Sequence, residues 1–132
     1  MPIFTISVGH ILLVESDEAS CIALTNMLKG HGYIVRCAAT LDEAMAELAS
    51  DPSHVIVDLM MPDNGGLAVL QFIRTTMPRT RVAILSEWVS PLLTDHLKPD
   101  LVLRNKSEFV KLMDWLRDAY HPEIAKAESS DT

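Results

Sequence analysis

The sequence predicts an α/β protein, a doubly wound five-stranded parallel sheet of order 2-1-3-4-5. Short apolar runs rich in Val, Ile and Leu alternate along the 132 residues with segments of helical periodicity. Such runs are typical of parallel strands that are buried on both faces. Several of them end at an acidic or hydroxyl residue, as expected where strands meet a polar pocket at one edge of an open sheet.

The five expected strands are apolar runs at residues 11–15, 33–37, 55–58, 82–86 and 101–104. Between them the apolar residues recur at helical spacing, which is the crossover that parallel strands require. Helices are expected over residues 17–29, from Thr40 to about 48, over 67–76, from Ser90-Pro91 to Lys98-Pro99, and over 107–120.

Three of these helices have recognisable N-caps in the sequence. Asp17 is interpreted as the cap of the first helix rather than as a metal ligand. Thr40 followed three residues later by Glu43 forms a capping box. Ser107 is expected to cap the last helix, whose apolar face runs to Leu116.

Composition limits the function classes. The net charge is −7, and Lys and Arg do not cluster on one segment, which argues against nucleic-acid binding. No apolar stretch reaches membrane-spanning length, so a cytoplasmic protein is expected. Cys21 and Cys37 lack metal-ligand spacing and are predicted to be reduced core thiols. One domain is expected over residues 1–121, followed by a polar tail over 122–132.

Acidic and hydroxyl residues end three neighbouring strands of the predicted sheet. Glu15 follows the first strand, Asp58 ends the third and Ser86 follows the fourth. In the order 2-1-3-4-5 the switch point lies between the first and third strands, where ligands bind in open α/β sheets. We therefore expect Glu15 and Asp58 to meet in one pocket.

The motifs taken together resemble the receiver domain of two-component response regulators, a flavodoxin-like fold. The resemblance extends from about Ile11 to Tyr120. Its strongest part is DLMMPDNGG at residues 58–66, which is similar to the phosphoacceptor strand of that family and the Met-Pro loop after it. Each motif alone is weak; the sequence order of residues 11–15, 32–35, 40–41, 58–66 and 83–86 makes the resemblance specific.

The resemblance implies a role for each matching residue. Asp58 matches the aspartate that receives a phosphoryl group from a histidine kinase or a phosphotransfer protein. Glu15 matches the first of two acidic residues that organise Mg²⁺, and the backbone carbonyl of Met60 matches a main-chain metal ligand. Ser86 matches the hydroxyl that turns toward the phosphoryl group. Such transfer depends mostly on positioning and charge neutralisation.

Two positions depart from the family pattern. Ser16 stands in place of the second acidic metal ligand, so Mg²⁺ binding is expected to be weak or absent. The usual Lys-Pro pair is missing, and the phosphate-binding cation is either Arg104, with Asn105 in place of the proline, or Lys106. Arginine is not a neutral replacement for lysine at such a site.

Two functions fit this pattern. The first is a stand-alone receiver in a phosphorelay, which accepts a phosphoryl group on Asp58 and signals through a downstream protein or a homodimer. The alternative is a degenerate receiver that binds proteins without phosphorylation. An enzyme is not expected, because haloacid-dehalogenase-type phosphatases need a second Asp where this chain has Met60.

Overall fold

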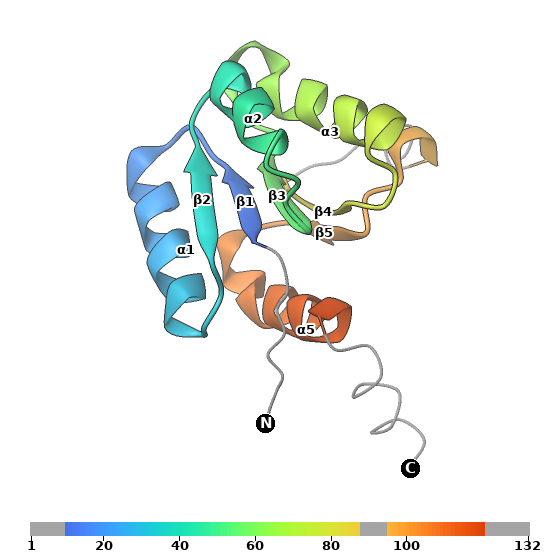
Figure 1. Cartoon of the computed structure of the whole chain (residues 1–132). Helices are drawn as coiled ribbons and strands as arrows, with labels where there is room; N and C mark the ends of the chain where they lie inside the picture. Colours follow the sequence, from blue (N-terminus) through green and yellow to red (C-terminus); the bar gives the residue numbers. More distant parts are fainter. Residues whose placement is uncertain (1–9, 88–94, 121–132) are drawn as a thin grey trace, which may run out of the picture.

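The computed structural model describes residues 10–87 and 95–120, which form a five-stranded parallel sheet with helices on both faces (Figure 1). The strands are β1 (Ile11–Val14), β2 (Val35–Ala38), β3 (His54–Asp58), β4 (Arg81–Leu85) and β5 (Leu101–Leu103). Their order is β2-β1-β3-β4-β5, and every neighbouring pair is parallel. The predicted fold is confirmed, strand order included.

The helices pack in two pairs on the sheet. They are α1 (Glu18–Gly30), α2 (Leu41–Leu48), α3 (Gly65–Thr76) and α5 (Phe109–Tyr120), with 3₁₀ turns η1 (Pro62–Asn64) and η2 (Lys106–Glu108). Helices α2 and α3 cover one face, and α1 and α5 cover the other (Figure 1). Residues 95–97 are also helical; the expected start of that helix at Ser90 lies outside the described residues.

Alternation along the strands divides the core into two layers. Successive side chains of a strand point to opposite faces, so neighbouring apolar residues enter different layers. Leu12 and Val14 pack with α2 and α3, whereas Ile11 and Leu13 pack with α1 and α5. All four are at most 1% exposed, which explains why this strand is an unbroken apolar run.

Two of the predicted caps are present as hydrogen bonds. The Asp17 side chain accepts from the backbone N–H of Ser20 at 2.9 Å. The Thr40 hydroxyl accepts from the N–H of Glu43 at 3.1 Å, and the Glu43 carboxylate accepts from the N–H of Ala39 at 2.8 Å. These side chains satisfy amides that have no partner inside the helix, and so define where α1 and α2 begin.

The predicted cap of the last helix is wrong. Ser107 lies inside the η2 turn, and Asn105 caps that turn: its side-chain oxygen accepts from the backbone N–H of Ser107 at 2.9 Å. The chain leaves β5 and makes the η2 turn before α5, so α5 itself begins only at Phe109. Two apolar residues of this helix, Leu112 and Leu116, are buried as expected.

The prediction of two reduced thiols is also wrong. Cys21 on α1 and Cys37 on β2 form a disulfide, with their Cα atoms 6.6 Å apart. Helix α1 packs against β2 and brings together two cysteines that lie 16 residues apart in the sequence.

Among the described residues no helix is long and apolar enough to cross a bilayer.

Candidate functional site

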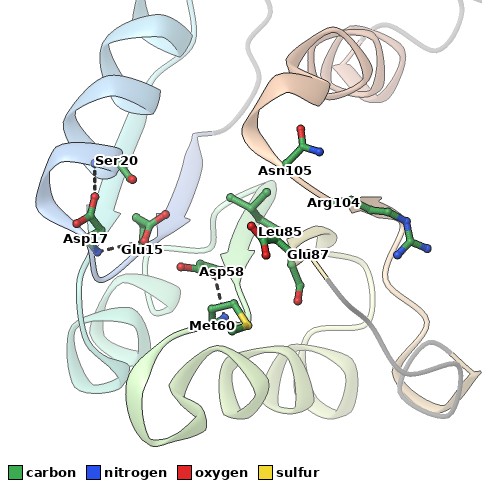
Figure 2. A pocket seen from close by; sticks show the side chains of 10 residues that line it. Glu15, Asp17, Ser20, Asp58, Met60, Leu85, Glu87, Arg104 and Asn105 are labelled. Atoms are coloured by element: carbon green, nitrogen blue, oxygen red, sulfur yellow. Dashed lines mark hydrogen bonds between the residues drawn. The ribbon is translucent and has the colours of Figure 1, made fainter.

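The carboxyl ends of β1, β3, β4 and β5 surround a cavity of about 550 Å³. Strand pairing accounts for its position: Val14 pairs with Val57, so the next residues, Glu15 and Asp58, lie beside each other at this edge of the sheet. The lining residues are Glu15, Asp17, Ser20, Asp58, Met60, Leu85, Ser86, Glu87, Arg104 and Asn105 (Figure 2).

The two neighbouring carboxylates are held by backbone amides. Glu15 is 3% exposed, and its Oε2 accepts from the backbone N–H of Asp17 at 3.1 Å. Asp58 is half-buried, and its Oδ1 accepts from the backbone N–H of Met60 at 2.9 Å (Figure 2). Because a buried carboxylate is costly unless it is hydrogen-bonded, these amides explain how the chain keeps the two groups at a sheet edge.

The loop after β3 folds tightly back onto Asp58. Asp63 and Asn64 both have a φ of 57°, in the left-handed region that Asn and Asp tolerate better than most residues. This turn starts α3 beside the strand it has just left. A Cβ placed on Gly66 would lie only 2.2 Å from the carbonyl oxygen of Asp58. The glycine is therefore required by the close approach of helix and strand.

The opposite wall of the cavity comes from β4 and β5. Ser86 follows β4, is 3% exposed, and donates its backbone N–H to the carbonyl of Leu103 at 2.9 Å. Arg104 follows β5 and is exposed, and Figure 2 shows its guanidinium turned away from Asp58. The side chain of Lys106, the other predicted cation, lies outside the described part of the structure.

Ser16 lies outside this cavity. It is exposed and lines a neighbouring hollow of about 330 Å³, together with Thr40 and Asp63. Asp17 does line the main cavity, but its carboxylate caps α1. The cavity is therefore built around Glu15 and Asp58.

Several residues that line the cavity were not predicted as site residues, among them the polar residues Glu87 and Asn105. Glu87 directly follows Ser86, and this position in the sequence could have indicated that it lies at the same sheet edge. Asn105 was considered only as a replacement for proline. Glu87 adds a carboxylate to a cavity that already contains Glu15, Asp17 and Asp58. The one cationic side chain among the described lining residues is Arg104.

The donors in the cavity suit Mg²⁺ better than a softer metal. Mg²⁺ prefers oxygen ligands and is commonly held by one or two carboxylates, with water and phosphate oxygens completing its shell. Glu15 and Asp58, which lie beside each other in the cavity, offer two such carboxylates. Within residues 10–87 and 95–120, no group of three or more His, Cys, Asp or Glu side chains is placed to hold a metal.

The fold and the cavity are those predicted for a receiver domain, and comparison with known proteins identifies the family. Residues 11–102 match the response regulator receiver domain family. The chain therefore belongs to that family, whose members act in two-component signalling, are typically phosphorylated on an aspartate and typically bind Mg²⁺ at that site.

Curated relatives include regulators and a kinase. The photosynthetic apparatus regulatory protein RegA of Cereibacter sphaeroides is 30% identical over 77 residues, covering 58% of this chain and 42% of RegA. The response regulator MprA of Mycolicibacterium vanbaalenii is 36% identical over 78 residues, covering 58% of this chain and 34% of MprA. The sensor kinase CckA of Brucella abortus is 30% identical over 93 residues, covering 68% of this chain and 10% of CckA. The chain thus spans less than half the length of these relatives.

Solved structures share the fold at low sequence identity. The response regulator TrrA of Thermotoga maritima, in complex with Mg²⁺ and BeF, superposes with a TM-score of 0.75 at 23% identity, covering 85% of this chain and 99% of TrrA. The chemotaxis protein CheY4 of Vibrio cholerae gives a TM-score of 0.74 at 19% identity, covering 86% and 99% of the two chains. These likenesses establish the fold.

Proposed function

We propose that the chain is a stand-alone cytoplasmic receiver that accepts a phosphoryl group on Asp58 and passes the signal on by binding another protein. The observation that carries this proposal is the cavity itself, in which Glu15, Asp58 and Ser86 meet.

The domain is taken to extend over residues 1–121, with 122–132 as a tail. The phosphoryl donor is a histidine kinase or a phosphotransfer protein, as receivers generally use. We propose no enzymatic output beyond this transfer.

The residues of the cavity have distinct parts in this transfer. A carboxylate oxygen of Asp58 forms the new bond to phosphorus while the bond from phosphorus to the donor nitrogen breaks, and the donor imidazole keeps that electron pair. The amide of Met60 holds the other Asp58 oxygen and so orients the nucleophile. The Ser86 hydroxyl and the guanidinium of Arg104 then bind the phosphoryl oxygens once Arg104 turns inward. Bound Mg²⁺ would neutralise developing charge beside Glu15 and Asp58.

An observation favours a second candidate, a receiver that binds partners without phosphorylation. Ser16 contributes no carboxylate to the cavity, and Glu87 brings an additional negative charge to it. Both features work against an incoming dianionic phosphoryl group, the first by weakening metal binding and the second by repulsion. The two candidates differ in whether Asp58 can be phosphorylated.

The deciding experiment is labelling with acetyl phosphate followed by intact-mass measurement. The wild-type protein is expected to gain one phosphoryl group in the presence of Mg²⁺, and Asp58→Asn is expected to gain none. Asp63→Asn is the matched control, since Asp63 lies five residues on and lines the neighbouring hollow. A folded wild-type protein that gains no mass would favour the phosphorylation-independent candidate.

The effect of Ser16 on metal binding gives a second prediction. Ser16→Asp is expected to raise Mg²⁺ affinity about tenfold, because a carboxylate is a far better ligand than a neutral hydroxyl. Isothermal titration with Mg²⁺ measures the change, and Ser50→Asp at the end of α2 is a control for the added charge alone. Equal affinities in the two variants would contradict the proposed effect of Ser16 on metal binding.

A further inference from the structure

The turn between β5 and α5 carries Arg104, and it has no proline to stiffen it. Residues 104–107 read Arg-Asn-Lys-Ser. A cationic side chain binds phosphate best when its own backbone is held in place. A mobile backbone lowers the fraction of time in which the side chain lies close enough to the phosphate. The contacts that hold the backbone of Arg104 therefore determine whether its side chain can reach the cavity.

Glu108 supplies the main contact. Its Oε1 accepts from the backbone N–H of Arg104 at 2.5 Å, and its Oε2 accepts from the ammonium of Lys111 one turn along α5. The backbone N–H of Glu108 in turn donates to the carbonyl of Asn105 at 3.2 Å. The Glu108 side chain thus connects Arg104, which directly follows β5, to Lys111 on α5.

Asn105 closes the same turn from inside. Its side-chain oxygen accepts from both the backbone N–H and the hydroxyl of Ser107. Its own backbone is extended, with a φ of −161° and a ψ of 170°. The Asn105 side chain fixes the start of η2, whereas Glu108 alone ties Arg104 to α5 among the hydrogen bonds of the described residues.

We propose that Glu108 is a positioning residue that holds the backbone of Arg104 where its guanidinium can reach a phosphoryl group on Asp58. The inference rests on the proposed function. Glu108 touches neither the phosphoryl group nor the metal; it acts through Arg104. In this chain the contact takes the place of the stiffness that a proline would give the turn.

The charge on Glu108 strengthens the contact. A hydrogen bond from a backbone amide to an ionised carboxylate is stronger than one to a neutral oxygen. The hydrogen bond from Lys111 lowers the pKa of Glu108, and the amide of Arg104 lowers that pKa further. Glu108 is therefore ionised at neutral pH, and Lys111 keeps its carboxylate in place.

The test compares three variants in their affinity for beryllofluoride, which mimics a phosphoryl group, in the presence of Mg²⁺. Glu108→Ala removes the acceptor and is expected to weaken beryllofluoride binding about tenfold. Glu108→Gln keeps an oxygen for the amide of Arg104 and is expected to stay within about twofold of wild type. Asp114→Ala is the matched control, because Asp114 is also on α5 and pairs with Arg117 three residues on at 3.8 Å.

Two further readouts separate positioning from general stability. Mg²⁺ affinity without beryllofluoride is expected to be equal in all variants, because Glu15 and Asp58 lie on the other side of the cavity. Amide hydrogen exchange at Arg104 is expected to accelerate in Glu108→Ala and not in Glu108→Gln. If Glu108→Ala does not fold, Glu108→Asp replaces it, since the shorter side chain keeps the charge but withdraws the acceptor from Arg104.

The outcomes distinguish this inference from the proposed function. If the wild-type protein binds beryllofluoride and the folded Ala or Asp variant binds it equally well, Glu108 has no positioning role while the proposed function stands. If the folded wild-type protein takes up neither beryllofluoride nor a phosphoryl group, the proposed function is wrong and the role of Glu108 falls with it. Weakened binding in Glu108→Ala with rescue in Glu108→Gln supports the inference.

Discussion

Replacing Gly66 with alanine is expected to destabilise the domain by about 2 kcal/mol and to disturb Asp58 directly. The added Cβ would lie 2.2 Å from the carbonyl oxygen of Asp58, 3.0 Å from its carbonyl carbon and 3.1 Å from the Cα of Leu59. All three atoms belong to the backbone, so no side-chain rotation can relieve the overlap. The N-terminus of α3 or the end of β3 must shift instead.

Denaturant unfolding measures the loss of stability, and acetyl-phosphate labelling measures the effect on Asp58. Labelling is expected to fall even where the Gly66→Ala variant remains folded, because the strand end that presents the carboxylate has moved. Gly30→Ala is the control: nothing lies within 4 Å of a Cβ at Gly30, the last residue of α1. Alanine favours a helix over glycine, so that variant should be neutral or slightly more stable. Equal stability of the two variants would contradict the proposed close packing.

The fold could be predicted because its signals are local and repeat in order. Residues 55–57 form an unbroken apolar run rich in β-branched residues, which is typical of a strand buried on both faces, and the structure places all three at 2% exposure or less. The capping box of Thr40 and Glu43 marks a helix start within five residues of sequence. Once strands and helices alternate, the crossover rules leave few arrangements of the sheet.

Features that depend on distant residues were harder to predict. Cys21 and Cys37 come together because α1 packs on β2, and their separation in sequence does not indicate that contact. The part of Glu87 in the cavity depends on where the chain turns after β4. Asn105 and Ser107 both suit a cap position, and only the path of the chain after β5 shows that Asn105 caps the η2 turn while Ser107 lies inside it.

The second large effect concerns pH and His54, at the opposite end of β3 from Asp58. His54 is 4% exposed; its Nδ1 lies 2.8 Å from the hydroxyl of Ser53, and its ring packs edge-on against Trp115 with centroids 5.3 Å apart. Burial is the largest cause that lowers the pKa of His54; the positive charge of Arg81 also lowers it, and Asp100 raises it by less. Together they bring this pKa from 6.5 to about 4. The folded protein therefore keeps this imidazole neutral in mildly acidic solution.

Stability is expected to fall as the pH drops from 6.5 to about 4. Over that interval the unfolded chain binds a proton on His54 that the folded chain does not, so protonation favours unfolding. The contribution of neutral His54 to the free energy of unfolding is fully present above pH 6.5 and is lost progressively below it. Between pH 6.5 and about 4 this loss amounts to about 3 kcal/mol. Urea unfolding at several pH values measures this loss.

Carboxylates also titrate in the lower part of this range, so the informative quantity is a difference between two proteins. His54→Phe keeps a ring against Trp115 but cannot bind a proton. As the solution is acidified, the wild-type protein should therefore lose more unfolding free energy than His54→Phe does. Parallel curves, together with an NMR titration of His54 near its ordinary pKa, would show that the imidazole is solvated and that burial does not control its charge.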